Sequence, residues 1–360
     1  MNEAKQMPAK ENKRFVNLDL LRIVSIYTMI IVHTAAMKWY SEPVDSYNWM
    51  IMNIYDSLVR FCVPVFIMLS GWNMLDPKRT SSIGELYGKR ILRLVTAYIF
   101  WAAAYVFYDK IDLIAAGQKP FESIYDFINA IIVGHFHLWF VFMLVGLYIA
   151  IPVLKPIAEN PKTARYFLAV SFFAAIFMPA FRYVPIIGTF TAQINEKLRL
   201  DVFLGYSFYF VLGYYLKNLK ISKLIKLIIY SGGAASVIAT VYLTYLSSVL
   251  KNIKCELFYE YLLPTTMLAA LSVFIFFRDT VGKIKFSQKA TKIISYISGC
   301  SFGMYLIHDF INMNLVKMGL TVVSVNPVFM VPLFAFIVFI ISFIAVSIIK
   351  LIPGLNKFIV

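Results

Sequence analysis

The chain has 360 residues, of which 60% are hydrophobic and only 15% are charged. A water-soluble domain of this length cannot place so many apolar side chains on its surface, so the composition excludes a soluble globular protein and favours a membrane protein. The formal net charge of +15 does not indicate a nucleic-acid partner, because Lys and Arg occur in short clusters between apolar runs, as topology signals do.

Ten apolar stretches follow one another along the chain, and each is close to the length of about 20 residues that crosses a bilayer. We therefore predict an all-α integral membrane protein, with a basic tail at 1–15, one transmembrane domain at 16–353 and no appended soluble domain. The apolar segment 124–134 is too short to span, so we expect an interfacial or re-entrant helix there. The ten predicted spans are residues 16–36, 49–75, 91–109, 137–155, 165–182, 200–217, 223–248, 257–277, 293–315 and 327–351.

The distribution of positive charge predicts the orientation. An even number of spans places both termini on one side of the membrane, and the tails and loops on that side contain 23 Lys and Arg residues, against nine in the loops on the other side. Because Lys and Arg are concentrated in cytosolic loops, both termini are predicted to be cytosolic.

The first predicted span contains three ionisable residues: Asp19, Arg22 and His33. At about 100° per residue, the steps from Arg22 to His33 make three turns plus about 20° and rise about 16 Å, so both side chains lie on one helix face at different depths. Arg22 suits an anionic group near the cytosol, and His33 suits proton transfer further out. The alternative is that Arg22 only pairs with Asp19 and that His33 is an interior histidine; the spacing alone does not decide between them.

The second predicted span contains Asp56 and Arg60 four residues apart, the order that favours a structural ion pair on a helix. Pro64 frees a backbone carbonyl, and Ser70-Gly71 permits close approach of another helix, so we expect a bend near a cavity.

Arg90 and Arg93 lie one helical turn apart at the cytosolic surface. Their two guanidinium groups are suited to holding a nucleotide phosphate. Topology determination and contact with anionic lipid headgroups explain the same pattern equally well.

All four histidines of the chain, at positions 33, 135, 137 and 308, fall toward the extracytoplasmic side, which ordinary interior histidines do not explain. The pattern His135-x-His137 is by itself a weak metal signal, and Cys62, Cys255 and Cys300 match neither a disulfide framework nor a zinc site. We therefore predict no metal site.

Two further groups flank these histidines. Trp139 and Phe140 suit an interfacial aromatic belt. His308 is followed by Asp309, but adjacent helical residues diverge by about 100°, so a direct bond between the two side chains is not expected. Signatures of soluble enzymes, such as a P-loop, a G-x-S-x-G elbow or an H-E-x-x-H motif, are absent from the sequence.

Taken in order, these segments resemble the membrane-bound acyltransferase family 3, whose members acylate cell-surface glycans and other exported molecules. The resemblance covers nearly the whole chain. It rests on five motifs: Leu18-Asp19-Leu20-Leu21-Arg22 followed by His33 with ten residues between Arg22 and His33, Pro64 to Gly71, Arg90-x-x-Arg93, His137-Leu138-Trp139-Phe140, and Tyr305-Leu306-Ile307-His308.

The resemblance implies a ten-span fold in the plasma membrane that transfers an acyl group from cytosolic acyl-coenzyme A, expected to be acetyl-coenzyme A, to a hydroxyl of an exported glycan or lipid-linked precursor. It implies that no cofactor is bound. His33 then resembles the catalytic histidine, with Arg22 and Asp19 as its partners in the motif, and Arg90 with Arg93 resembles the donor-binding pair. The remaining motif residues are expected to contact substrate: His137, Trp139, Tyr305 and His308.

Within that family, the chain is most similar to exopolysaccharide and common-antigen O-acetyltransferases, because it ends just after its tenth predicted span. Membrane lipid, the acyl donor and the glycan acceptor are the expected partners, no nucleic acid is expected, and a homo-oligomer is left open. Two alternatives remain: a transporter or flippase of anionic or lipid-linked solutes, with Asp19, Arg22 and His33 along its path, and a haem-bearing electron carrier using His33 and His308.

Overall fold

The computed structural model describes residues 15–77, 82–182, 184, 186–198 and 204–359, and every regular element in this part of the chain is helical. In chain order the elements are α1 (Val16–Trp39), α2 (Tyr47–Val59), α3 (Cys62–Met74), α4 (Ile83–Glu85), η2 (Leu86–Ile91), α5 (Leu92–Asp109), α6 (Ile111–Ala115), α7 (Ile124–Val133), η3 (Phe136–Leu138), α8 (Trp139–Ile149), α9 (Ile151–Glu159), α10 (Pro161–Ser171), η4 (Phe172–Phe177), α11 (Met178–Ala180), α12 (Ile187–Leu198), α13 (Ser207–Tyr215), α14 (Lys223–Lys251), η6 (Leu257–Tyr259), α15 (Pro264–Asp279), η7 (Val281–Lys283), α16 (Gln288–Lys317), α17 (Pro327–Ile349) and α18 (Leu355–Phe358).

Among the described residues, seven helical stretches are long and apolar enough to cross a membrane. An eighth is added if α7 and the following η3–α8 segment, which are bent by 61° relative to each other, form one span. The multi-pass, all-α prediction is therefore confirmed. The count of ten and the orientation of the termini stay predictions.

The other two predicted spans coincide with α13 and α16. Helix α13 has only nine residues, and part of the predicted span 200–217 lies outside the described residues. Helix α16 has 30 residues, but it buries many polar side chains, so it does not qualify on hydropathy. A helix of this kind is expected in the interior of a bundle, where its polar groups find partners.

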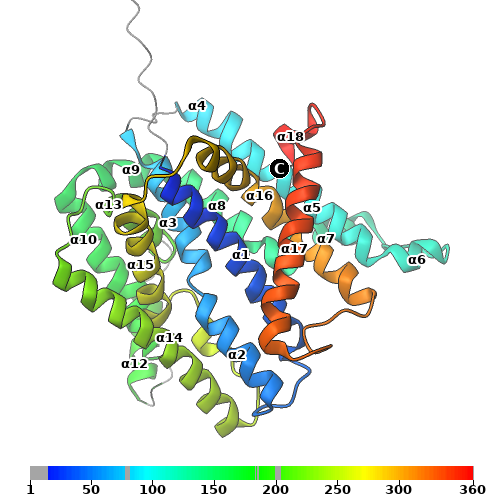
Figure 1. The fold of residues 1–360 in the computed structure, drawn as a ribbon, viewed down its shortest axis with the longest axis horizontal. Helices are drawn as coiled ribbons and strands as arrows, with labels where there is room; N and C mark the ends of the chain where they lie inside the picture. The colour runs from blue at the N-terminus through cyan, green and yellow to red at the C-terminus, as the bar shows by residue number, and fades with distance from the viewer. Residues whose placement is uncertain (1–14, 78–81, 183, 185, 199–203, 360) are drawn as a thin grey trace, which may run out of the picture.

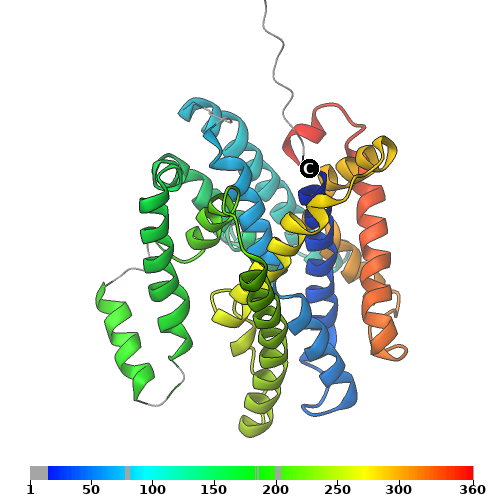
Figure 2. The same cartoon turned by 60° about the vertical axis from the view of Figure 1, so that its left-hand side comes forward.

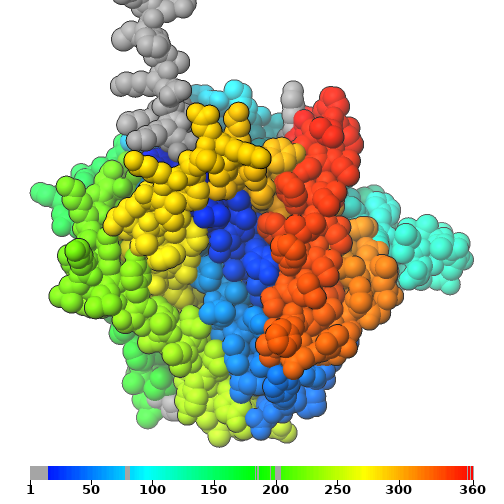
Figure 3. All heavy atoms as spheres, viewed as in Figure 1, coloured from blue at the N-terminus to red at the C-terminus, as the bar shows by residue number. Residues whose placement is uncertain are grey.

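Helix α1 is the central element of the bundle. It packs against α2, α3, α15, α16 and α17, and Figure 3 shows it on one face between the yellow α15 segment and the orange-red α17. The first described turn of α1 lies at the same end of the bundle as α4 and α18, while α2 and the end of α14 lie at the opposite end (Figures 1 and 2). We call the first of these the basic end.

The second predicted span is broken in the middle. Helix α2 ends at Val59 and α3 begins at Cys62. Pro64 lies in the first turn of α3, where a missing N–H costs little, and it leaves the carbonyl of Arg60 without a helical donor. The break therefore falls just before the proline, and the side chain of Arg60 at the break is mostly buried.

Close packing of α3 against α13 depends on two glycines. A Cβ added at Gly71 would lie 1.8 Å from the carbonyl oxygen of Phe210, and one added at Gly213 would lie 2.0 Å from that of Met68. Both obstacles are backbone atoms, which cannot rotate away. The prediction that Gly71 permits close helix approach is confirmed, and the contact fixes α3 beside the site described below.

We expect Gly71→Ala to destabilise the protein by about 1–3 kcal/mol, because the new methyl group must push α3 away from α13. Thermal unfolding in a single detergent measures the change. Gly232→Ala is the matched control, since Gly232 is a helical glycine with no neighbouring atom within 4 Å of the added Cβ. The control should be neutral or slightly stabilising. Equal stability of the two variants would contradict the packing argument.

Candidate functional site

A cavity of about 750 Å³ opens at the basic end between α1, α3, α5, α8 and α16. Its volume lies within the range of small-molecule and cofactor sites. We call it the basic cavity. It is lined by Phe15, Leu18, Asp19, Arg22, Phe66, Ser70, Asn73, Met74, Lys89, Arg90, Arg93, Leu94, Phe140, Leu144, Tyr148, Ser298, Gly299, Ser301, Phe302 and Tyr305.

Four cationic side chains and one carboxylate line this cavity, so its field favours anions. Arg90 and Arg93 both face it, as expected from their spacing. Lys89 of η2, a π-helix, also lines the cavity and pairs with Glu85 at 3.1 Å. The three cations therefore form a continuous basic rim, suited to a ligand with several phosphate groups.

Asp19 and Arg22 meet α16 on the inner side of the cavity. The carboxylate of Asp19 accepts hydrogen bonds from the hydroxyls of Ser298 (2.8 Å) and Ser295 (3.2 Å). The guanidinium Nη1 of Arg22 lies 3.8 Å from Asp19 and 3.4 Å from the Ser298 hydroxyl. The ion pair with Asp19 is thus present but long, and Arg22 still lines the cavity.

The basic cavity ends at two aromatic side chains. Phe140 and Tyr305 both line it and contact each other, with ring centroids 5.4 Å apart. His33 is not among the described residues that line the cavity. Arg22 therefore lines the cavity and His33 does not, and we call the aromatic pair at this end of the cavity the floor.

All four histidines of the chain gather beyond the floor. The ring of His33 lies 5.0 Å from that of His308 and 6.2 Å from that of His137, measured between centroids, and His137 lies 5.1 Å from His135. They come from three separate segments: α1, the 135–137 segment and α16. The four histidines, which are predicted from the sequence to lie on one side of the membrane, thus lie close together in space, and we call them the histidine cluster.

His308 has a defined tautomer. Its Nδ1 lies 2.6 Å from the backbone carbonyl oxygen of Tyr305, which can only accept, so Nδ1 carries the proton and Nε2 offers a lone pair. That Nε2 is buried and has no hydrogen-bond partner among the described residues. The side chain of Asp309 points elsewhere, toward His135 and Asn312, in agreement with the expected divergence of positions 308 and 309.

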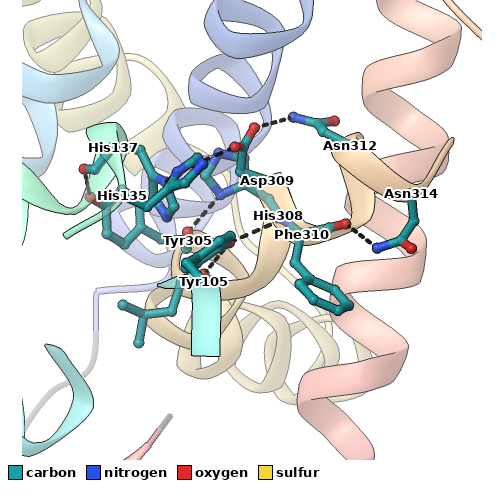
Figure 4. A network of polar contacts seen from close by, with 10 residues as sticks. Tyr105, His135, His137, Tyr305, His308, Asp309, Phe310, Asn312 and Asn314 are labelled. Carbon is teal, nitrogen blue, oxygen red and sulfur yellow. Dashed lines mark hydrogen bonds and ion pairs between the residues drawn. The ribbon is translucent and has the colours of Figure 1, made fainter. Parts of the chain in front are cut away.

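A tyrosine hydroxyl stabilises α16 beside these residues (Figure 4). Tyr105 donates a hydrogen bond to the carbonyl oxygen of Leu306 (2.9 Å) and accepts one from the N–H of Phe310 (3.0 Å). In an undisturbed helix those two backbone groups bond to each other. The hydroxyl of Tyr105 therefore contacts both ends of one turn of α16, at the level of His308 and Asp309.

A second pocket of about 610 Å³ lies beyond the cluster, away from the basic end. We call it the tyrosine pocket. Arg60 forms part of its lining, pairs with Asp56 at 2.6 Å and lies over the rings of Tyr259 and Tyr261. The expected Asp56–Arg60 ion pair is thus present. The pocket is lined by Arg60, Tyr206, Lys251, Cys255, Glu256, Leu257, Tyr259, Glu260, Tyr261 and Leu262.

Trp139 connects this pocket to the histidine cluster. Its ring stacks on Tyr261, with centroids 5.9 Å apart and planes at 23°, and lies 5.8 Å from Tyr206.

Glu256 borders the tyrosine pocket, and partial burial raises the pKa of its carboxyl group. Stacked aromatic rings beside carboxylates and a hydrogen-bonding guanidinium are suited to a polar ligand with apolar faces.

The residues predicted from the sequence thus fall into three connected groups. Asp19, Arg22, Arg90, Arg93 and Tyr305 line the basic cavity; His33, His137 and His308 form the cluster; Trp139 borders the tyrosine pocket.

Sequence reasoning missed Lys89, Ser298 and the contribution of Asp309 to the cluster. The serines at positions 295, 298 and 301 recur every three residues along a predicted span, and this spacing was an available signal for a polar helix face.

Comparison with known proteins identifies one relationship. A family model described as an acyltransferase domain matches residues 15–351, which is nearly the whole chain. No curated protein and no solved structure matches the chain.

The floor can be tested by cysteine labelling in a background in which the three native cysteines are replaced. We expect Ser70→Cys, inside the basic cavity, to react with a membrane-impermeant thiol reagent added from the side of Arg90. His33→Cys should not react from that side, because Phe140 and Tyr305 intervene. Adding Tyr305→Ala to His33→Cys should open access from that side. Labelling of His33→Cys with the floor intact would show that the cavity is continuous.

Proposed function

Because the chain belongs to acyltransferase family 3, whose model covers residues 15–351, we propose that it is an O-acyltransferase of the plasma membrane that moves an acyl group from cytosolic acyl-coenzyme A to a hydroxyl of an exported glycan or lipid-linked precursor. The observation that carries this proposal is the basic cavity, which has a cationic rim and ends at Tyr305, whose ring lies 5.5 Å from that of His137 in the histidine cluster. Acetyl is the acyl group that we expect.

The donor fits the basic cavity by charge. The phosphates of coenzyme A would bind at the rim formed by Lys89, Arg90 and Arg93. The neutral pantetheine arm would then extend along Ser298 and Ser301 of α16, which offer hydroxyl groups, toward Tyr305. This places the thioester at the floor, next to the cluster. Arg22, oriented by Asp19 and Ser298, lies beside this path.

The reaction needs one base. In the proposed step, neutral His33 accepts the proton of the acceptor hydroxyl while the hydroxyl oxygen attacks the thioester carbonyl. The carbon–sulfur bond then breaks, and the coenzyme A thiolate takes the proton from His33. The adjacent ring of His308, whose Nε2 has a free lone pair, is placed to share that proton. Movement of Phe140 and Tyr305 must accompany transfer.

The acceptor would approach from the tyrosine pocket. Its aromatic rings suit the apolar faces of a sugar, and its carboxylates and Arg60 suit sugar hydroxyls. Trp139 extends this surface to the 135–137 segment of the cluster. On this proposal, donor and acceptor enter from opposite sides and meet at His33.

One observation also favours a transporter or flippase. Two pockets separated by an aromatic floor are what an alternating-access carrier of anionic or lipid-linked solutes would present. Acyl transfer in nanodiscs separates the two functions, because nanodiscs have no sealed compartments and report chemistry alone.

We expect His33→Ala to lower acetyl transfer by about 10²–10⁴-fold, the usual contribution of a general base. The measurement incubates protein in nanodiscs with radiolabelled acetyl-coenzyme A and extracted envelope glycan, and counts label in the glycan. Asp112→Asn, an exposed carboxylate on α6, is the control and should transfer at the wild-type rate. Normal transfer by His33→Ala would exclude His33 as the base, and transfer by no variant, wild type included, would favour the carrier.

We expect Arg90→Gln and Arg93→Gln each to raise the KM for acetyl-coenzyme A by about tenfold with a small change in kcat, because each removes a charge-assisted hydrogen bond to a phosphate. The effect of added salt on KM should also weaken. Arg165→Gln is the control, since Arg165 is an exposed cation on α10 outside the basic cavity. A lowered kcat at unchanged KM would place these residues outside the donor site.

A further inference from the structure

Three potential ligand atoms converge at one point of the histidine cluster (Figure 4). The Nδ1 atoms of His135 and His137 lie 3.0 Å apart, and the Oδ2 atom of Asp309 lies 3.5 Å from Nδ1 of His135. All three atoms lie within 4.8 Å of one another. Among the described residues this is the one group of histidine, cysteine and carboxylate side chains with such spacing.

Neighbouring groups hold each ligand in place. Asn312 donates a hydrogen bond to the other oxygen of Asp309, Oδ1, at 3.1 Å, which leaves Oδ2 facing His135. Tyr105 stacks on the ring of His135, with centroids 4.4 Å apart and planes at 23°. The hydroxyl of Tyr305 bonds to the backbone carbonyl of His137. Such second contacts usually accompany metal ligands, because they fix ring and carboxylate orientation.

Without a cation, the negative charge of Asp309 and the imidazole lone pairs of His135 and His137 are not all compensated. Asp309 and His137 are buried, and the side chain of His135 is only 12% exposed. One proton can lie between the two Nδ1 atoms, which are 3.0 Å apart. The histidine pair is then neutral, so the buried carboxylate of Asp309 has no compensating positive charge unless the pair takes up a further proton. A divalent cation would satisfy both imidazole lone pairs and the carboxylate together.

We propose that His135, His137 and Asp309 bind one Zn²⁺ ion. Two imidazole nitrogens and one carboxylate oxygen are a donor set that zinc accepts, with a fourth position left for another ligand. The ion would tie the segment that carries Trp139 to α16 and so fix one side of the histidine cluster. The inference replaces the expectation of no metal, because it rests on Asp309, which lies far from His-x-His in the sequence.

The test uses full-length protein in detergent, purified through a tag without histidine and dialysed against metal-free buffer. Elemental analysis after addition of one equivalent of Zn²⁺ and desalting should give about one zinc per chain, and Zn²⁺ should raise the thermal unfolding temperature. Co²⁺ in its place should show the visible absorption of a four- or five-coordinate site. None of these readouts depends on acyl transfer, so the proposed function and this site can fail separately.

His135→Gln and Asp309→Asn should each lose the zinc and the thermal shift. His33→Ala is the matched control, because it removes an imidazole of the same cluster that is not one of the three ligands, and it should retain both. If Asp309→Asn does not fold, His135→Gln and the wild-type titration still decide. Wild-type protein that neither retains zinc nor is stabilised by it would overturn the proposal and leave these residues as a proton-sharing network.

Discussion

The structure depends on the polar contact between α1 and α16. A bilayer offers no water to ionisable side chains, so each of them must find a partner inside the bundle. At the basic end, Asp19 of α1 accepts hydrogen bonds from Ser295 and Ser298 of α16; deeper in, the rings of His33 and His308 lie against each other. The two helices are thus joined at two depths, by hydrogen bonds near the basic end and by a contact between imidazole rings deeper in.

This constraint explains why α16 is at once long and insufficiently apolar to be recognised as a span by hydropathy. Its polar residues face α1 and the basic cavity instead of lipid. Helix α1 in turn is surrounded by five other helices. Substitution of its charged residues is therefore expected to destabilise the bundle.

The sequence was sufficient for the features that depend on local periodicity. The apolar runs predicted the helices, and Gly71 predicted close packing. Features that depend on the tertiary structure were not accessible. The floor of Phe140 and Tyr305 and the meeting of Asp309 with His135 each join segments whose separation in sequence carries no signal of their proximity.

The hydroxyl of Tyr105 has a mechanical consequence. Because it bonds to both the carbonyl of Leu306 and the N–H of Phe310, a slight opening of that turn of α16 would leave both backbone groups with a hydrogen-bond partner. The residue before this joint is Tyr305, half of the floor, and the residues after it include Asp309. A small bend of α16 at Tyr105 would therefore move the floor and the carboxylate of Asp309 together. Passage from the basic cavity would then be coupled to the geometry of the histidine cluster.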